Sequence, residues 1–396
     1  MKLTFVSNYI NHHQIPVSTE LYKKLGEDYC FIQTEPIEQE RVKMGWEEKK
    51  GLPYVVNYYE YQRYCDMLIM DSDVVVFGGT DDESYIQPRL AAKKLVIRYS
   101  ERLYKTGQWK AISPRGLRKK FIDHTRYWRS QVYLLCAGGY VPSDFNIIKA
   151  YPNKMLKWGY FPETKQIDVD KTLALKQEVS DKWDAVTMLW AGRFIDWKHP
   201  EVPIELAQRL KAKGYKFKLR MIGGGEMRQK MQNLLLEYEL QDCVNLVGYM
   251  KPEEVREQME EAQIFLFTSD YQEGWGAVLN EAMNSACAVV ASHAIGAVPY
   301  LLQHEKNGLI YPSGDMFKLV KQVERLFEDR ELREKLGRGA VDTILQQWNA
   351  ENAADRLLKI SEKLVSDQTL ELYEEGPCSK AEVIKQRKMY KILRGK

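Results

Sequence analysis

The sequence predicts an α/β protein with two doubly wound, Rossmann-like domains. Its 396 residues exceed the roughly 100 to 200 residues of an ordinary domain. Short apolar segments alternate with longer amphipathic segments in both halves of the chain, which is typical of βαβ units and a parallel sheet. With 44% hydrophobic and 29% charged residues, the composition excludes collagen-like and wholly disordered proteins.

The expected elements of the first domain, residues 1–160, follow from the spacing of the apolar residues. Short apolar runs predict strands over residues 3–6, 73–77, 94–97 and 131–136. Apolar residues at helical spacing predict helices over 16–25 and 58–70. Pro152, Pro162 and the polar residues up to 184 then interrupt the pattern, which predicts a linker at 161–184.

The second domain, residues 185–346, repeats the same alternation. Its expected strands are 186–191, 216–222, 244–247, 264–267 and 288–291, and its expected helices begin near His199, Glu226 and Pro252. The chain is helical in pattern from 314 to 365, with expected joints at Gly337, Gly339 and 346–349. We expect a helix at 347–366 that packs back on the first domain, followed by a basic tail at 367–396.

Several classes of protein do not fit this sequence. The apolar runs fall short of the roughly 20 residues that a membrane-spanning helix needs. The first strand is followed by Ser7 and Asn8, so we expect no secretory signal and a cytoplasmic protein. The six cysteines stand singly, which favours buried thiols over zinc sites or disulfides. The Asp71-Ser72-Asp73 triplet precedes a strand instead of following one, so we expect no metal there.

The strongest candidate site follows the expected strand that ends at Phe267. Gly274 and Gly276 allow the backbone to approach a ligand, and a helix follows. Glu273 is expected to accept hydrogen bonds from sugar hydroxyls, and Glu281 those of a ribose. The alternative is an exposed glutamate plus a helix glutamate in an ordinary ion pair. The setting of a strand, glycines and a helix favours a nucleotide-sugar site, with Trp275 between the glycines.

The second half of the chain resembles the retaining family 4 glycosyltransferases of the GT-B fold. The resemblance rests on signatures that occur in the family's order: Ala191-Gly192-Arg193 with Lys198, Gly223-Gly224-Gly225, the segment from Glu273 to Glu281, Gly296 to Pro299, and Asn307 to Tyr311. It implies two domains that face each other across a cleft, with C-terminal helices that cross back. It also implies that Gly192, Gly223 and Gly224 lie at the donor nucleotide.

The resemblance further implies an enzyme that moves a sugar from a nucleotide sugar to an acceptor with retention of configuration. Arg193 and Lys198 would stabilise the leaving diphosphate, and Glu273 would orient the transferred sugar. Neither a metal nor another cofactor is expected. The expected acceptor is a glycan or a lipid-linked glycan in cell-surface polysaccharide synthesis. Two alternatives stay open: a nucleotide-sugar epimerase of the same fold, and a catalytically inactive nucleotide-sugar-binding protein that docks at membranes.

Two features of the first half concern the acceptor side. His12 and His13 follow the first strand. They are expected either to bind an acceptor hydroxyl or the donor diphosphate, or to cap a helix or fill the core. Residues 104–129 combine eight lysines and arginines with aromatic residues. This pattern favours docking of 104–129 and the basic tail at an anionic membrane, at the inner face, over a solvated helix whose aromatics lie in the core. No nucleic-acid motif accompanies the charge, so we expect no nucleic-acid partner.

Overall fold

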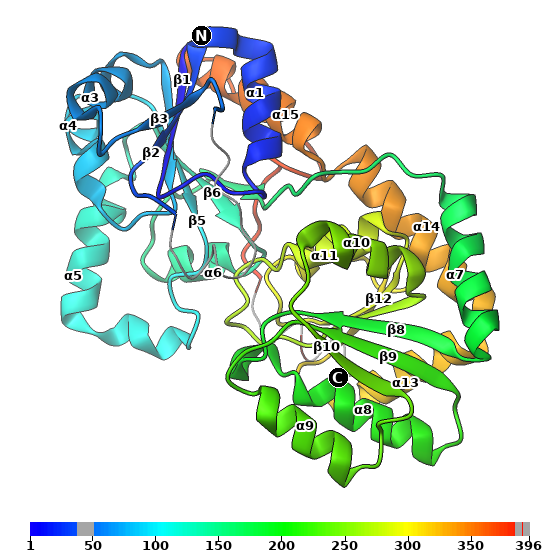
Figure 1. The fold of residues 1–396 in the computed structure, drawn as a ribbon. Coiled ribbons are helices and arrows are strands. Elements are labelled where there is room, and N and C mark those ends of the chain that lie inside the picture. The colour runs from blue at the N-terminus through cyan, green and yellow to red at the C-terminus, as the bar shows by residue number, and fades with distance from the viewer. Residues whose placement is uncertain (38–50, 385–389, 391–396) are drawn as a thin grey trace. The chain divides into compact units, whose positions relative to one another are not determined.

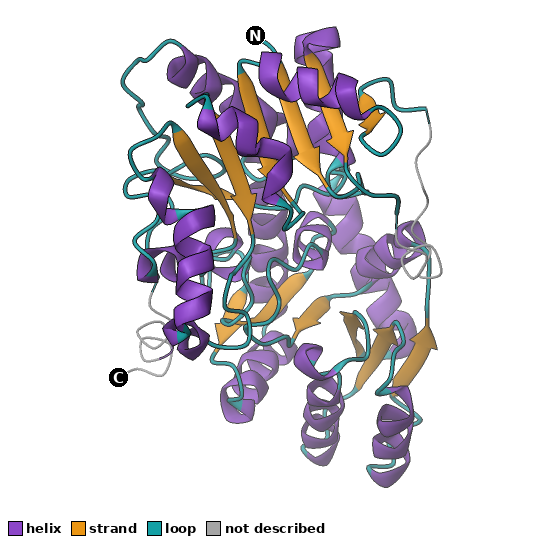
Figure 2. Ribbon diagram, turned by 90° about the vertical axis from the view of Figure 1, so that its left-hand side faces the viewer, coloured by secondary structure: helices purple, strands orange, loops and turns teal. Residues whose placement is uncertain are grey.

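The structure is a computed structural model that describes residues 1–37, 51–384 and 390, and the chain divides into two compact units (Figure 1). The first unit contains Met1–Glu163 together with Trp348–Ile384. The second unit contains Thr164–Gln347. Each unit has one parallel sheet with helices packed against it, which confirms the predicted fold class (Figure 2).

The sheet of the first unit has seven parallel strands in the order β3-β2-β1-β4-β5-β6-β7. Their bounds are β1 Leu3–Ser7, β2 Tyr29–Gln33, β3 Val55–Asn57, β4 Val74–Gly78, β5 Val96–Ser100, β6 Val132–Ala137 and β7 Met155–Trp158. Chain order reverses between β1 and β4, which makes this the switch point of a doubly wound sheet. All residues of β1 and β4 are buried, as expected for strands covered on both faces.

The helices of the first unit include the last long helix of the chain. Their bounds are α1 Ile15–Leu25, α3 Gln62–Asp71, α4 Gln87–Ala91, α5 Pro114–Asp123, α6 Val141–Ile147 and α15 Ala350–Val365. Helix α15 packs against α1, and Lys24 forms an ion pair with Asp355 at 2.7 Å. Where the chain re-enters the first unit, Trp348 stacks on Phe161 with 6.4 Å between the ring centroids. The C-terminal helix therefore belongs to the first unit.

The sheet of the second unit has six parallel strands in the order β10-β9-β8-β11-β12-β13. Their bounds are β8 Val186–Ala191, β9 Phe217–Ile222, β10 Val244–Gly248, β11 Ile264–Phe267, β12 Ala288–Ser292 and β13 Leu309–Tyr311. The helices are α7 Val169–Trp183, α8 Glu201–Ala212, α9 Arg228–Glu237, α10 Pro252–Glu261, α11 Val278–Asn284, α12 Val298–Leu301, α13 Met316–Glu328 and α14 Arg330–Gln346.

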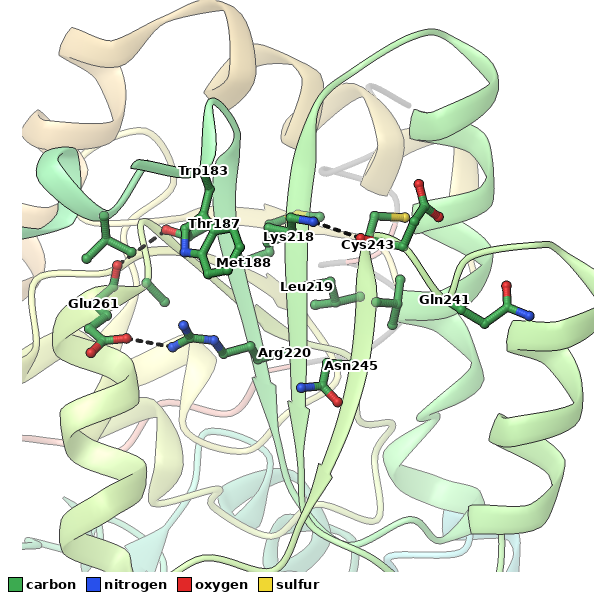
Figure 3. A pocket seen from close by; sticks show the side chains of 14 residues that line it. Trp183, Thr187, Met188, Lys218, Leu219, Arg220, Gln241, Cys243, Asn245 and Glu261 are labelled. Atoms are coloured by element: carbon green, nitrogen blue, oxygen red, sulfur yellow. Dashed lines mark hydrogen bonds and ion pairs between the residues drawn. The ribbon is translucent and has the colours of Figure 1, made fainter. Parts of the chain in front are cut away.

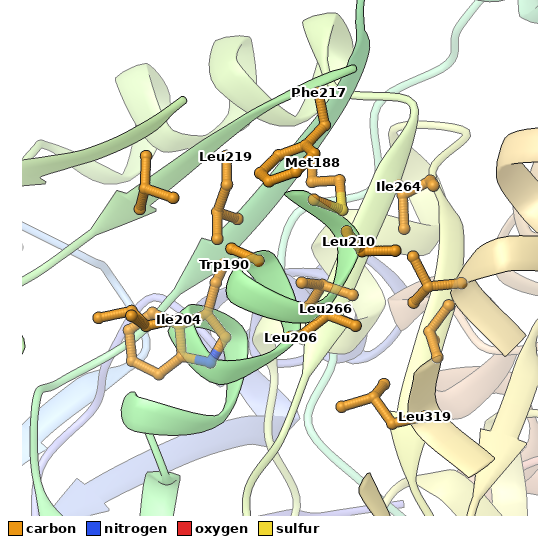
Figure 4. Close-up of a cluster of buried hydrophobic side chains, with 14 of the residues drawn as sticks. Met188, Trp190, Ile204, Leu206, Leu210, Phe217, Leu219, Ile264, Leu266 and Leu319 are labelled. Carbon is orange, nitrogen blue, oxygen red and sulfur yellow. The ribbon is translucent and has the colours of Figure 1, made fainter. Parts of the chain in front are cut away.

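One face of this second sheet forms the main core of the unit (Figure 4). Met188 and Trp190 of β8 and Leu219 of β9 pack against apolar residues of α8 such as Leu206. Burial of such side chains contributes about 25 cal/mol for each Å² of apolar surface removed from water. Because the strands are parallel, this packing brings their carboxyl ends to one common edge.

The expected strands all exist, with ends shifted by at most three residues, but the sequence pattern does not predict four further strands. The missed strands are β2, β3, β7 and β13. β3 and β13 have three residues each, which is too few to show a period. β7 is a partly exposed edge strand that contains Lys157, so it is not a continuous apolar run. The expected helix over 58–70 begins later, at Gln62.

The expected joints at Gly337 and Gly339 are wrong, because both glycines lie inside α14. Their small size serves packing: a Cβ on Gly337 would lie 2.5 Å from the carbonyl oxygen of Ala286, and one on Gly339 would lie 2.5 Å from that of Lys306. The break in the helical pattern falls instead at Asp329, whose side chain accepts a hydrogen bond from the Leu332 amide at 2.8 Å.

The segment predicted as a linker contains α7, and the unit boundary lies after Glu163. Helix α7 is held by a buried lysine: Lys176 donates from Nζ to the carbonyl oxygens of Met259 and Ala262, each at 2.6 Å, at the end of α10. In the predicted tail, Cys378 and Ser379 are buried and pair with Lys157 of β7. Most of the basic residues of the tail lie outside the described residues.

None of the helices within the described ranges combines the length and the apolar character needed to cross a membrane.

Arg89 is a fully buried cation that joins α3 to the sheet of the first unit. Its guanidinium donates to four carbonyl oxygens, those of Ile69, Ser72, Asp73 and Leu95, at 2.7 to 2.9 Å. The first three lie at the turn from α3 into β4, where helix carbonyls have no partner in the helix. The Asp71-Ser72-Asp73 triplet is thus part of a structural turn at the amino end of β4.

We expect the Arg89→Met substitution to lower the free energy of unfolding by at least about 2 kcal/mol, because it leaves several buried carbonyl oxygens without donors. Urea unfolding followed by circular dichroism measures the change. Arg63→Met is the matched control, since Arg63 is exposed on α3, and it should change the stability by less than about 0.5 kcal/mol. Equal effects of the two substitutions would contradict this role of Arg89.

Candidate functional site

Three loops of the second unit, which follow β8, β9 and β11, meet at the carboxyl edge of its sheet. The first two are in backbone contact: Phe194 N donates to Gly224 O at 2.8 Å, and Met227 N donates to Phe194 O at 3.0 Å. A Cβ on Gly223 would lie 2.0 Å from the Gly192 carbonyl oxygen, and Gly223 has a φ of +127°. Glycine is therefore required here for close packing of the two loops, whether or not a ligand also contacts it.

The loops after β8 and β11 bring Lys198 and Glu273 together. Nζ of Lys198 lies 2.5 Å from Oε2 of Glu273, and both side chains are nearly buried, with exposed fractions of 13% and 10%. Ser269 donates to the same carboxylate oxygen at 3.0 Å. Thr268 links the two loops, since its hydroxyl donates to the carbonyl oxygen of Lys198 at 2.9 Å. Two residues 75 positions apart in the sequence thus form one charged pair at the sheet edge.

Arg193 lies in the same loop as Lys198, and both cations lie near one aromatic ring. The ring centroid of Trp197 is 5.9 Å from the Arg193 guanidinium carbon and 4.7 Å from Lys198 Nζ. Cations attract the faces of aromatic rings at such distances. The structure therefore brings together three of the predicted residues, Arg193, Lys198 and Glu273.

His199 joins the loop after β8 to the loop after β11 by electrostatic contacts. Its Nδ1 lies 2.9 Å from Glu201 Oε1, and its Nε2 lies 3.6 Å from Asp270 Oδ2. The carboxylates of Asp270 and Glu201 raise the pKa of His199 to about 10. The Asp270 amide also donates to the Trp197 carbonyl oxygen at 3.0 Å. These contacts hold the backbone of the Lys198 loop against that of the Glu273 loop.

Glu281 lies in the first turn of α11, after the glycine turn at 274–276. Its side chain is partly buried, and burial raises the pKa of its carboxyl group to about 7, although Arg256 acts in the opposite direction. Trp275 is buried, and its indole donates to Asn280 Oδ1 at 2.9 Å. The Trp275 side chain is thus a core side chain and not a ligand contact.

The other two residues of this turn are glycines in tight backbone packing. A Cβ on Gly276 would lie 2.5 Å from the ring of Phe267, and its φ is +90°. The carbonyl oxygen of Gly274 lies 1.7 Å from the Cβ position of Gly296, so the turn rests directly on the loop after β12. The glycine turn is held from both sides and fixes the start of α11.

His12 and His13 lie in the first unit, between β1 and α1, at the carboxyl edge of its sheet. Their rings are 3.8 Å apart, and the His13 ring stacks on Tyr160 at 5.8 Å with 13° between the planes. The Tyr160 hydroxyl donates to Glu101 Oε1 at 2.5 Å. Glu101 and Tyr160 thus lie near His13 at this edge, although no sequence motif indicates them.

A cavity of about 330 Å³ in the second unit does not coincide with these loops (Figure 3). Thr187 and Met188 of β8, Lys218 and Leu219 of β9 and Val244 of β10 line it, so it lies toward the amino ends of the strands. Arg220 at this cavity is already paired with Glu261 at 2.6 Å. The candidate site is therefore at the opposite end of the sheet.

Sequence reasoning missed four residues of the charged loops: Trp197, His199, Ser269 and Asp270. Ser269 and Asp270 lie inside the stretch that was singled out, and their position directly after a buried strand was an available signal. The sequence pattern predicts only that a helix begins near His199. Its contact with Asp270 depends on the pairing of β8 with β11, which no local pattern reveals.

The raised pKa of His199 predicts a pH-dependent contribution to stability. A group whose pKa is higher in the folded state stabilises the protein fully below its unfolded pKa of about 6.5, and this contribution disappears as the pH rises toward 10. One third of the side chain is exposed, so we expect the His199→Gln substitution to cost only about 1 kcal/mol at pH 6. At pH 10.5 the cost should be close to zero. Urea unfolding of the wild type and the variant at the two pH values measures this difference in the free energy of unfolding. A difference that does not change with pH would indicate a packing role for His199 instead.

Most of the second unit is similar to a known family of proteins. Residues 174–342 match the sequence model of the family described as glycosyl transferases group 1. The amylovoran biosynthesis glycosyltransferase AmsK of Erwinia amylovora is 33% identical over 144 residues, which is 35% of this chain and 35% of AmsK. The putative colanic acid biosynthesis glycosyltransferase WcaL of Salmonella typhimurium is 26% identical over 190 residues, 46% of this chain and 47% of WcaL. The chain thus spans about a third to a half of the length of the curated relatives it matches.

Solved structures match nearly the whole chain at low identity. HepE of Anabaena, crystallised with UDP, superposes with a TM-score of 0.67 over 92% of this chain and 100% of HepE, at 13% identity. WaaG, a glycosyltransferase involved in lipopolysaccharide biosynthesis, superposes with a TM-score of 0.59 over 89% of this chain and 98% of WaaG, at 15% identity. At such low identities the similarity shows only that the fold is shared, and this shared fold is the GT-B fold.

Proposed function

We propose that this chain, whose second unit contains a domain of the glycosyl transferases group 1 family, is a glycosyltransferase that uses a nucleotide-sugar donor and retains the configuration of the transferred sugar. The observation that supports this most is the charged pair of Lys198 and Glu273, with Arg193 in the same loop, at the carboxyl edge of a doubly wound sheet. Ligands bind at this edge in sheets of this topology.

The geometry of the pair leaves hydrogen-bonding capacity for a donor. Among the described residues, the hydrogen bonds to the Glu273 carboxylate come from Lys198 and Ser269 and reach Oε2, so Oε1 is available to a sugar hydroxyl. A lysine ammonium has three donors, and one of them meets Glu273. The remaining donors of Lys198, with the guanidinium of Arg193, are proposed to bind the diphosphate.

Charge stabilisation is the proposed source of catalysis. As the glycosidic bond breaks, negative charge grows on the diphosphate, and positioned cations bind this transition state more strongly than the ground state. The acceptor hydroxyl attacks from the leaving-group face, and a phosphate oxygen of the donor takes its proton. No protein nucleophile and no metal take part in this proposal. Glu281 binds the ribose, and Gly192, Gly223, Gly224, Gly274 and Gly276 shape the backbone around the nucleotide.

The proposed acceptor is a glycan or a lipid-linked glycan, bound by the first unit near His12 and His13, in polysaccharide synthesis. The names of AmsK and WcaL, which concern amylovoran and colanic acid biosynthesis, support this class of product. We propose that the reaction takes place in the cytoplasm, at the inner face of the membrane.

Donor binding is the first test of this function. We expect one of UDP, GDP or ADP, with its sugars, to raise the melting temperature in a thermal-shift panel, with and without EDTA. A ligand at 100 times its dissociation constant adds about 2.7 kcal/mol of stability. The shift should persist in EDTA and should be reduced in Lys198→Met and Glu281→Gln. Lys182→Met and Glu237→Gln, two exposed positions on α7 and α9, are the matched controls and should bind as the wild type does.

The outcomes of this panel separate the alternatives. A shift that requires a divalent metal would contradict the metal-independent mechanism, and no shift with any nucleotide would contradict the donor site. Binding without any turnover would instead support an inactive binding protein. Formation of an epimeric nucleotide sugar without acceptor would support an epimerase.

Turnover is tested by donor hydrolysis, in which water replaces the acceptor. We expect Lys198→Met to release nucleoside diphosphate at least roughly 100-fold more slowly than the wild type, because a cation that stabilises the leaving group is missing. Proton NMR of the released sugar, recorded before mutarotation, should show the anomeric configuration of the donor. Release of the opposite anomer would contradict retention.

A further inference from the structure

Helix α5 and the residues on either side of it expose apolar side chains that have no cover in the first unit. No residue of α5 is buried, although an ordinary surface helix buries one apolar stripe against its core. The exposed apolar residues of this segment are Trp109 (68%), Ile112 (78%), Leu117 (40%), Phe121 (56%), Ile122 (39%) and Trp128 (47%). We call residues 109–129 the α5 surface. In Figure 1, α5 (cyan) lies at the periphery of its unit.

The apolar residues of the α5 surface are accompanied by positive charge. Seven lysines and arginines face one acidic residue, Asp123, which gives six net positive charges. They are Lys110, Arg115, Arg118, Lys119, Lys120, Arg126 and Arg129. Three of these cations lie over neighbouring aromatic rings; Arg129, for example, lies 4.5 Å from the ring centroid of Trp128. Burial lowers the pKa of His124 to about 2, so it adds no charge.

Both ends of the α5 surface are attached to the folded unit by buried or partly buried contacts. His124 Nδ1 lies 2.8 Å from the Tyr151 hydroxyl, and the Thr125 hydroxyl donates to Ile148 O at 2.9 Å. Just before the surface, Gln108 donates to Asp144 at 2.8 Å. The helix between these contacts is therefore held in place while its apolar side chains stay exposed.

We propose that the α5 surface docks on an anionic lipid bilayer, with its apolar side chains among the headgroups and its cations on the lipid phosphates. A bilayer uses both properties of the surface, because aromatic rings favour the headgroup level and each lysine or arginine adds electrostatic attraction. A nucleic acid would bind the cations but would leave aliphatic side chains such as Ile112 and Leu117 exposed to water.

The position of the α5 surface in the chain connects docking to the acceptor. The segment that contains it leaves the sheet at the carboxyl end of β5, directly before Glu101. Glu101 contacts Tyr160, and Tyr160 stacks on His13. Docking would hold this edge of the first unit near the lipid headgroups. This link between docking and the acceptor rests on the proposed function. It implies that the acceptor is a lipid-linked glycan in the membrane on which the protein docks.

The test uses the full-length protein and vesicles of phosphatidylcholine with and without 30% phosphatidylglycerol. We expect co-sedimentation with the anionic vesicles that weakens with salt. Replacing Arg118, Lys119 and Lys120 together by glutamine should weaken binding roughly 100-fold, at about fivefold for each charge. Replacing Lys182, Lys321 and Lys335 of the second unit by glutamine removes the same charge from exposed positions and should leave binding unchanged.

The apolar contribution is tested separately with Ile112→Ser combined with Phe121→Ser. This variant should bind less at every salt concentration, and brominated lipids should quench the fluorescence of Trp109 or Trp128 in the wild type. No vesicle binding, or equal binding by the wild type and the glutamine variant of α5, would overturn the proposal. Binding to single-stranded RNA through the same cations, without binding to vesicles, would overturn it in favour of a nucleic-acid surface.

Failure of docking and failure of the proposed function give different results. Donor hydrolysis in solution does not involve the α5 surface, so the α5 variants should hydrolyse the donor at the wild-type rate. If the wild type hydrolyses the donor but does not bind vesicles, only the docking proposal is contradicted. If the wild type does not hydrolyse the donor, the proposed glycosyltransferase function is contradicted.

Discussion

The backbone contact between the loops after β8 and β9 is the constraint on which the candidate site depends. The Gly192 carbonyl oxygen occupies the place where a side chain on Gly223 would be, so the two loops pack main chain against main chain. This contact sets the direction in which the chain leaves β8, and Lys198 follows within one short turn. The position of Lys198 thus depends on the absence of a side chain at Gly223, in the loop after the neighbouring strand β9.

The second constraint is electrostatic and joins the β8 loop to the β11 loop. Lys198 and Glu273 neutralise each other in a nearly buried position, while His199 contacts Asp270 in the same pair of loops. Truncating either member of a buried pair would leave an uncompensated charge, which is costly. The same arrangement holds a cation and a carboxylate ready at the sheet edge, where a charged donor would exchange contacts with them. Stability and the proposed chemistry therefore depend on the same residues.

The first unit shows a different use of charge. Its buried cations are satisfied inside the fold: Arg89 by carbonyl oxygens, and Arg98 by Glu83 at 2.6 Å. The cations of the α5 surface are mostly exposed and stand beside exposed apolar side chains. The contrast between buried cations that pair inside the fold and exposed cations beside uncovered apolar side chains is the basis for the proposed docking of α5.

The fold class, the positions of most of the longer strands, and the choice of Phe267 to Glu281 as the main candidate site follow from the sequence alone. These features are local: buried parallel strands are continuous apolar runs, and glycines after them mark tight turns. The three-residue strands were not predictable, because so few residues show no period. Three other features become visible only in the folded unit: Trp275 is a core residue, Gly337 serves packing, and His199 contacts Asp270. Each of these depends on residues brought together by strand pairing or helix packing across long sequence separations. Likewise, the sequence shows that residues 109–129 combine basic and apolar side chains, but it does not show which of them are buried. The packing of the first unit shows which apolar side chains stay exposed.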